Sequence, residues 1–338
     1  MAIVGSEATV ATTVSVSQST VLSATDLQKS YDGRPALRGL SFTLEAGRVL
    51  GFLGPNGAGK TTAIRILTTI IEADSGHFEV AGVSSRYPEQ IRRRIGVLPE
   101  SQGYPGQVTG LEYLAYYARH YGWSTSEAKE YSLALLQEVG MQKRANSLIG
   151  TYSRGMRQRL GIARALVNNP VVAFLDEPTL GLDPKGQQEL LEMVRRIARE
   201  RNAGVILCSH LLSEIEGVCD DVVILSWGQV AAKGSMTEVA GQAQRNGVRI
   251  HVPSPSADQA QRILEAIPDV KVTGNGAAPG RLQVEFVNGA RPNTREDDGL
   301  YNGILEALIG AKIPILGFEG QGSRLQDVFL RLTQEEIQ

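Results

Sequence analysis

The chain has 338 residues, of which 42% are hydrophobic and 21% are charged, so it is long enough for about two domains with buried cores. Its formal net charge of −2 argues against the broad basic field that holds nucleic acid. Its two cysteines lack a C-x-x-C spacing, which argues against a disulfide framework or a metal site and fits a reducing cytosol.

The first twenty residues do not have the pattern of a signal peptide. Residues 1–20 are rich in Ser, Thr, Val and Ala but contain no Lys or Arg, so they lack the basic start of a signal peptide. We expect a disordered tail there. No stretch of the chain approaches the roughly 20 apolar residues that a membrane-spanning helix needs. From about Leu22 to Leu53 we expect antiparallel strands around Tyr31, with a turn over residues 32–35.

A strand, a glycine loop and a helix are predicted between residues 48 and 71. The apolar run 48–53 predicts a buried strand, and a helix is expected from roughly Lys60 to Ile71. The loop between them fits the pattern G-x-x-x-x-G-K-[ST], which binds phosphate groups. It consists of Gly54, Pro55, Asn56, Gly57, Ala58, Gly59, Lys60, Thr61 and Thr62. In this pattern Lys60 neutralises the β- and γ-phosphates of a nucleotide, and the Thr61 hydroxyl is a ligand for Mg²⁺.

The middle of the chain is predicted to be helical. Apolar residues recur at helical spacing between about residues 111 and 148. The stretch Tyr152 to Leu160 reads as the start of another helix, with Ser153 in the N-cap position.

A second apolar run ends in two carboxylates. Residues 171–175 predict a buried parallel strand, which is followed by Asp176 and Glu177. An acidic pair in this position is usually a helix N-cap, but the phosphate loop upstream favours a catalytic role. Asp176 then fits a carboxylate that binds Mg²⁺ through water, and Glu177 fits a base that activates water.

The sheet is expected to continue with a strand at residues 205–208, which is followed by Ser209 and His210. A further strand is predicted to begin at Val222 and to lead into a hairpin turn over residues 227–229. After about Gly247 the pattern changes. Strands are predicted at 248–252, 270–272, 282–286 and 313–318, and helices at 257–267, 300–309 and 325–332. The order β-α-β-β-α-β suggests a small ferredoxin-like domain.

Residues 152–160 resemble the signature motif of ATP-binding cassette (ABC) proteins, and further elements of that family occur in order. Tyr31 resembles the aromatic residue that stacks on adenine. Residues 181–184, Gly-Leu-Asp-Pro, resemble the D-loop, and His210 resembles the switch histidine. The resemblance covers roughly residues 21–242. The form Ser-Arg-Gly-Met-Arg-Gln-Arg at 153–159 is similar to the type-2 exporter branch, whose membrane subunits are encoded separately.

The sequence departs from the family pattern in two places. Glu100 follows the Leu-Pro pair where the family usually has glutamine, and Gln102 lies two residues later, so either residue is a candidate for that role. A carboxylate at position 100 can still contact Mg²⁺ or its waters. The signature carries Arg154 and Met156 in place of the commoner glycine and glutamine, whereas Ser153 and Gly155 are retained.

The resemblance implies an α/β fold, namely a P-loop NTPase of the ABC cassette type with a mixed sheet core. This cassette would span residues 21–246, with a helical subdomain at about 100–165, and a small α+β accessory domain would span residues 247–338. ATP and Mg²⁺ are the implied ligands. Two copies would pack head to tail, so that Ser153 and Gly155 of one copy cap the ATP held by the other.

The resemblance also implies a role for each candidate residue. The catalytic residues are expected to be Glu177, His210 and Lys60, and the Mg²⁺ ligands Thr61, Asp176 and Glu100. The ATP-binding residues are expected to be Tyr31, the loop residues 54–62, Ser153, Gly155 and Asp183.

The favoured function is that of an exporter ATPase. It would act on the cytoplasmic face of the plasma (inner) membrane with an integral membrane permease and a second cassette copy, and without nucleic acid. The alternative is a soluble ABC ATPase that acts on ribosomes or nucleic acid.

Overall fold

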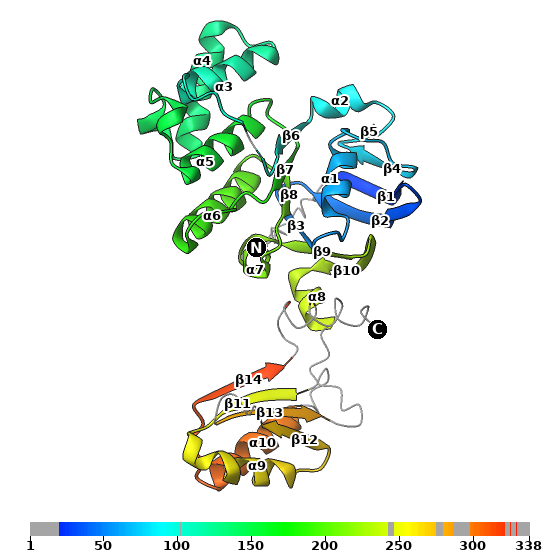
Figure 1. Cartoon of the computed structure of the whole chain (residues 1–338), viewed down its shortest axis with the longest axis vertical. Coiled ribbons are helices and arrows are strands. Elements are labelled where there is room, and N and C mark those ends of the chain that lie inside the picture. Colours follow the sequence, from blue (N-terminus) through cyan, green and yellow to red (C-terminus); the bar gives the residue numbers. More distant parts are fainter. Residues whose placement is uncertain are drawn as a thin grey trace, which may run out of the picture.

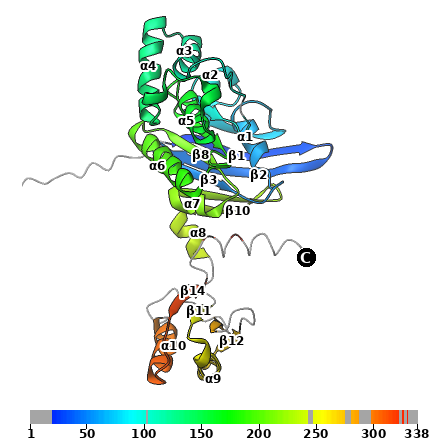
Figure 2. The same ribbon diagram turned by 60° about the vertical axis from the view of Figure 1, so that its left-hand side comes forward.

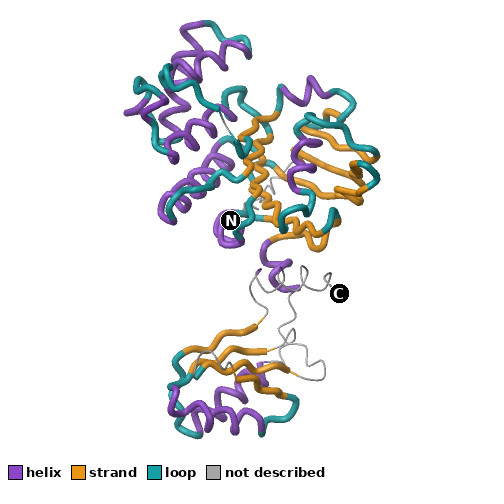
Figure 3. Tube along the Cα trace, in the orientation of Figure 1, coloured by secondary structure: helices purple, strands orange, loops and turns teal. Residues whose placement is uncertain are grey.

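The computed structural model describes residues 20–101, 103–242, 247–274, 280–286 and 298–321, together with Leu325 and Phe329. These residues form three sheets and the helices around them (Figure 1). Figure 3 shows that the strands of the first two sheets gather beside a separate group of helices, which corresponds to α3–α5.

The first sheet is antiparallel, and its strand order is β2-β1-β4-β5. Its strands are β1 (Thr20–Tyr31), β2 (Arg34–Glu45), β4 (Ser75–Val80) and β5 (Val83–Ser84). Asp32 and Gly33 join β1 to β2 with φ angles of 49° and 75°, which is the geometry of a tight hairpin turn. The turn expected after Tyr31 is therefore confirmed. Thr20, the last residue of the expected tail, is the first residue of β1.

The second sheet is mixed, and its strand order is β10-β9-β3-β8-β7-β6. Its strands are β3 (Val49–Leu53), β6 (Ile95–Leu98), β7 (Val172–Asp176), β8 (Gly204–Cys208), β9 (Asp221–Ser226) and β10 (Gln229–Ser235). Every pair is parallel except β9 with β10. The expected hairpin is confirmed at Trp227 and Gly228, whose φ angles are 47° and 81°. The expected antiparallel region from Leu22 to Leu53 therefore ends with β2, because β3 joins the parallel part of this second sheet.

The helices before residue 247 lie against these sheets or in the separate helical group. They are α1 (Lys60–Leu67), α2 (Pro88–Arg92), α3 (Gly110–His120), α4 (Thr125–Glu138), α5 (Arg154–Ala165), α6 (Pro184–Glu200), α7 (Leu212–Val218) and α8 (Met236–Gln242). Thr109 and Ser124 begin α3 and α4 with capping boxes, which confirms the helical region predicted there. The helix α1 ends at Leu67, before the expected Ile71, because Thr69 takes a left-handed φ of 60°.

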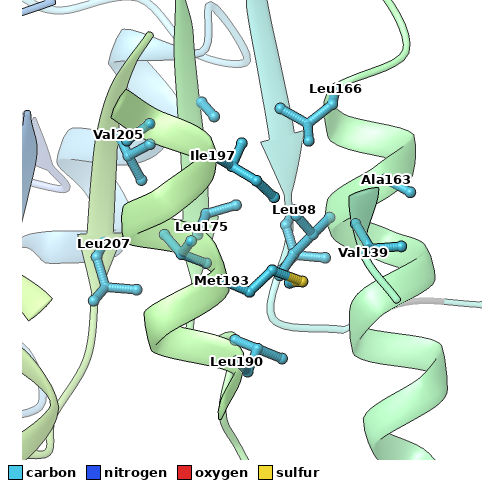
Figure 4. Packing of buried hydrophobic residues seen from close by; sticks show 14 of the residues in the cluster. Leu98, Val139, Ala163, Leu166, Leu175, Leu190, Met193, Ile197, Val205 and Leu207 are labelled. Carbon is cyan, nitrogen blue, oxygen red and sulfur yellow. The ribbon is translucent and has the colours of Figure 1, made fainter. Parts of the chain in front are cut away.

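Two hydrophobic clusters cover the two faces of the second sheet. On one face, Leu190, Met193 and Ile197 of α6 pack with strand residues such as Leu175 and with side chains of the helical group (Figure 4). On the other face, α1 and the first sheet pack against buried strand residues such as Phe52 and Phe174. Because both faces are covered, the strands β3, β7 and β8 read as continuous apolar runs in the sequence.

The C-terminal part contains a third sheet with its own core. Its elements are β11 (Gly247–His251), α9 (Ala257–Glu265), β12 (Val270–Gly274), β13 (Arg281–Phe286), α10 (Asp298–Gly310) and β14 (Gly317–Gln321). The strand order is β12-β13-β11-β14, with antiparallel pairs throughout. Figures 1 and 2 show α9 and α10 on the same side of this sheet. The order β-α-β-β-α-β is thus the one expected from the sequence, and the arrangement is ferredoxin-like.

Two details differ from the expectation for this C-terminal part. The last strand begins at Gly317 instead of residue 313, because Lys312 has a left-handed φ of 56° and Ile313 is buried in the third core before the strand starts. Leu325, which is 1% exposed, and Phe329 pack with the first cluster of the cassette and not with the third core. The rest of the helix expected at 325–332, and residues 1–19, lie outside the described residues.

Among the described residues, none of the helices combines the length and the apolar character that crossing a membrane requires.

The packing of β6 on α5 gives a testable prediction. A Cβ atom on Gly96 would lie 1.8 Å from the carbonyl oxygen of Ala165, the last residue of α5. We expect Gly96→Ala to lower the free energy of unfolding by about 2 kcal/mol or more, because backbone must move to make room. Urea unfolding followed by circular dichroism measures this loss.

Gly217→Ala is the matched control. Gly217 lies in α7, and a Cβ atom there meets nothing within 4 Å. Alanine should keep or raise the stability by about 0.5–1 kcal/mol, because it restricts the unfolded chain and favours the helix. Equal stabilities of the two variants would contradict the described packing.

Candidate functional site

The predicted site residues meet at the carboxyl edge of the parallel strands. The phosphate loop follows β3, Asp176 and Glu177 end or follow β7, and His210 lies two residues after β8. Because β8 lies between β3 and β7, these three strand ends are adjacent, and ligands bind at such edges in α/β sheets. They enclose a hollow of about 340 Å³. Its lining consists of Ala36, residues 56–62, Glu100, Asp176, Glu177, Leu180 and His210.

The backbone of the loop requires glycine at several positions. Gly57 and Gly59 have φ angles of 85° and 104°, which other residues rarely adopt. A Cβ atom on Gly59 would lie 2.6 Å from the Ala36 carbonyl oxygen, and one on Gly54 would lie 2.4 Å from that of Leu225. The loop is thus folded tightly against β2 and β9, and it leads into α1, whose N-terminal end favours anions.

Lys60 lies back across the loop. Its Nζ donates hydrogen bonds to the carbonyl oxygens of Gly54 (2.5 Å) and Pro55 (3.1 Å). Burial lowers the pKa of Lys60, and the negative charges of Glu177 and Asp176 oppose that effect. The ammonium group is therefore positioned in the hollow between the loop and the carboxylates.

The carboxylates create an unfavourable concentration of negative charge. Burial, followed by the charges of Glu100 and Glu177, raises the pKa of Asp176 from 3.8 to about 6, against the opposing effect of Lys60 and Arg65. A bound cation would relieve this repulsion. The described residues contain no group of three or more His, Cys, Asp or Glu side chains arranged as a metal centre. The oxygen donors of Thr61, Asp176 and Glu100 around the hollow fit Mg²⁺, which takes one or two protein carboxylates and completes its shell with phosphate oxygens and waters.

Glu177 and His210 form a direct pair. His210 Nδ1 lies 2.9 Å from Glu177 Oε2. Glu177 has a left-handed φ of 49°, an uncommon conformation for a non-glycine residue, and its amide donates to the Cys208 carbonyl oxygen at 3.0 Å. Such backbone strain gathers at functional sites. The strained turn places the carboxylate, which is mostly buried, beside the half-exposed imidazole.

The signature and D-loop residues do not line this hollow. Ser153 caps α5, where its Oγ accepts a hydrogen bond from the Met156 amide at 3.3 Å, as the sequence predicted. Asp183 caps α6 and accepts from the Gly186 amide at 3.1 Å. Gly155 follows Ser153 on the same turn. Arg154 lines a second hollow, which shares Glu100 and Leu180 with the first hollow but includes no residue of the phosphate loop.

Three further positions differ from what the sequence suggested or add to it. Tyr31 is 44% exposed and lies outside the lining of the hollow, where Lys29 Nζ is 6.0 Å from its ring centroid. Ala36 and Leu180 line the hollow but were not predicted, because no chemical property of either side chain marks it in the sequence. Glu100 lines the hollow, whereas Gln102 lies outside the described residues.

The charge of Asp176 gives a prediction for stability. Because the folded protein raises this pKa to about 6, the buried charge destabilises the fold above pH 6, and the penalty disappears as the pH falls toward 4. We expect Asp176→Asn to raise the free energy of unfolding by about 1–3 kcal/mol at pH 8 and to have little effect at pH 4. Urea titrations at the two pH values measure the difference.

Asp74→Asn is the control with the opposite sign. Its hydrogen bond with Lys29 lowers the pKa of Asp74, so loss of that charge should weaken the fold at pH 8 and not strengthen it. If Asp176→Asn had the same free energy of unfolding as the wild type at pH 8, the charge of Asp176 would not destabilise the fold.

The comparisons with known proteins identify the family of the chain. The family model for the ABC transporter matches residues 37–180. The chain is 34% identical to the Nod factor export ATP-binding protein I of Burkholderia thailandensis over 92% of this chain and 96% of that protein. It is 33% identical to the daunorubicin/doxorubicin resistance ATP-binding protein of Streptomyces peucetius, over 91% of this chain and 90% of that protein.

A solved structure, described as an ATP-binding subunit of an ABC transporter, superimposes with a TM-score of 0.59 at 32% identity. The match covers 66% of this chain and 93% of that one. The dimeric post-hydrolysis state of the cassette MJ0796, with ADP and phosphate, has a TM-score of 0.57 at 22% identity, which is evidence for the fold alone. The chain belongs to the ABC transporter family and is one of its ATP-hydrolysing, ATP-binding cassettes.

Proposed function

We propose that this cassette hydrolyses ATP to drive export through a separate membrane permease, with Glu177 and His210 at its reacting centre. The observation that carries the proposal is the Glu177–His210 contact of 2.9 Å within the hollow that the phosphate loop lines. A base beside a phosphate loop is the arrangement that activates water for attack on a terminal phosphate.

Each group in the hollow has a distinct role in this proposal. Lys60 neutralises the β- and γ-phosphates. Its ammonium group is already partly removed from water by burial, which lowers its pKa. Glu177 accepts a proton from the attacking water, and His210 holds the carboxylate in place while its other ring nitrogen faces the γ-phosphate. Thr61, Asp176 and Glu100 hold Mg²⁺, which supplies positive charge to the phosphate oxygens. Loop residues 54–62 bind the phosphates, and Tyr31 remains our candidate for adenine stacking.

A second copy completes the site. Ser153, Gly155 and Asp183 lie outside the hollow of their own chain, although the start of α5 carries an N-cap hydroxyl and no acidic residue in its first turn. The positive end of a helix that has no acidic residue in its first turn favours an anion. We propose that it meets the γ-phosphate held by another copy, and that Asp183 links the two sites across the dimer.

The membrane partner is a separate permease chain in this proposal, and the cassette binds it at the cytoplasmic face of the plasma (inner) membrane. Two relatives that align over nine tenths of the chain are named for Nod factor export and for daunorubicin/doxorubicin resistance. This favours export over the alternative of a soluble ATPase for ribosomes or nucleic acid.

We also propose a division into a cassette of residues 21–246, with a helical subdomain at about 100–165, and an accessory part of residues 247–338. The separate third core supports this division, and so does the match of a solved cassette to only 66% of the chain. Leu325, which belongs to the accessory part, is buried in the first cluster and so contacts the cassette.

Glu177→Gln tests the proposed reaction. Removal of the base should lower the rate of ATP hydrolysis by about 100-fold or more, while the phosphate loop still binds ATP. The variant should accumulate as an ATP-bound dimer in size-exclusion chromatography with light scattering. Affinity purification of this variant with ATP from detergent-solubilised membranes should recover a polytopic membrane protein in a comparable amount.

Lys60→Ala is the matched control, because it removes the phosphate contact and should abolish the ATP-dependent dimer. Wild-type turnover in Glu177→Gln would refute the assignment of the base. Recovery of ribosomes or DNA-repair proteins in place of a membrane protein would refute the export proposal.

A further inference from the structure

A buried carboxylate joins the two segments that carry the reacting pair. Glu214, in α7, is 3% exposed. Its Oε1 accepts a hydrogen bond from the Thr179 hydroxyl at 2.5 Å, and its Oε2 accepts one from the Ser209 hydroxyl at 2.6 Å. The Ser209 Oγ in turn accepts from the Leu211 amide at 3.0 Å. All three side chains are almost fully excluded from water.

The two hydroxyls belong to functionally different segments. Thr179 lies two residues after Glu177 and leads into the D-loop, residues 181–184. Ser209 directly precedes His210. One carboxylate therefore joins the segment after β7 to the segment after β8.

Anchoring of α7 does not explain this carboxylate. Ile215 and Val218 of the same helix are fully buried in the first hydrophobic cluster and already attach α7 to the sheet. Burial of a carboxylate is costly unless its oxygens receive hydrogen bonds. The two short hydroxyl bonds offset this cost, and they act on the loops and not on the helix core.

The same segment also contacts the signature helix. A Cβ atom on Gly181 would lie 2.3 Å from Cζ of Arg154, so the Arg154 guanidinium packs directly on the D-loop backbone. Contacts thus connect the start of α5 to the D-loop at Gly181, and the segment before the D-loop to Glu214 through Thr179. Glu214 is in turn bonded to Ser209, the neighbour of His210. A connected chain of packed groups of this kind is able to couple distant parts of a site.

We propose that Glu214 is a positioning residue that couples the D-loop to the Glu177–His210 pair. It holds His210 at hydrogen-bond distance from Glu177 only while Thr179, and with it the D-loop, is in its described position. Contact of a second copy with the D-loop is then transmitted to the reacting centre. This inference rests on the roles proposed above for Glu177 and His210.

The experiment compares Glu214→Ala with Glu214→Gln in the full chain. Alanine removes both acceptors, and we expect kcat for ATP hydrolysis to fall about tenfold or more while KM changes less than about twofold. Glutamine has the same shape, and the Ser209 or Thr179 hydroxyl can rotate to accept from its amide. We therefore expect kcat of Glu214→Gln to stay within about threefold of wild type.

A double-mutant cycle tests the coupling itself. Thr179→Val and Ser209→Ala each break one bond to Glu214, so their effects on kcat should be strongly non-additive in the wild-type background and additive in Glu214→Ala. Ser132→Ala is the control for loss of a buried hydroxyl bond, because Ser132 bonds Ala128 within α4, away from the site. It should destabilise the fold without changing kcat at a temperature where all variants are folded.

Thermal unfolding of each variant fixes that temperature. An unchanged kcat in Glu214→Ala, in a protein whose Glu177→Gln form is inactive, would overturn this inference and leave the proposed function intact. Equal losses of kcat in Glu214→Ala and Glu214→Gln would also overturn it. The effect would then not depend on the shape and the hydrogen bonds that glutamine preserves. Full activity of Glu177→Gln would instead refute the proposed function on which the inference rests.

Discussion

The parallel pairing of β3, β8 and β7 is the constraint on which the rest of the structure depends. It brings the phosphate loop, the Asp176–Glu177 pair and His210 to one edge of one sheet, although these groups are separated by up to about 150 residues of sequence. The two hydrophobic clusters on the faces of the sheet hold these strands in place. The hollow forms because these three strands end at adjacent positions of the sheet. Each strand is followed by a turn with an unusual backbone conformation or a fixed hydrogen bond.

The electrostatics of the hollow match the charge of its substrate. Lys60 and three carboxylates share the space, and burial disfavours the charged form of both Lys60 and Asp176. In our proposal, a triphosphate with Mg²⁺ would supply negative charge for Lys60 and positive charge for the carboxylates, so binding would relieve both penalties. The buried charges lower the stability of the fold but serve ligand binding, which is common in active sites. The Glu214 bonds to Thr179 and Ser209 join the segment that follows Glu177 to the residue that precedes His210.

Much of the fold and of the candidate site could be predicted from the sequence, because these features depend on local sequence patterns. The glycines of residues 54–59, the apolar runs of β7 and β8 and the N-cap of Ser153 each depend on neighbours in the chain. The remainder depends on tertiary packing. The end of α1 at Leu67, the late start of β14 and the position of Tyr31 outside the hollow follow from contacts between distant segments. Glu214 was not predicted because an acidic residue on a short helix is usually exposed.

The head-to-tail dimer is the central claim, and cross-linking in trans tests it most directly. One Glu177→Gln chain would carry Asn56→Cys and another Ser153→Cys, while the native Cys208 and Cys219 are buried and should not react. We expect a short bifunctional thiol reagent to join the two different chains when ATP and Mg²⁺ are present and not when they are absent. A cross-link that forms equally well without ATP, or none under either condition, would contradict it.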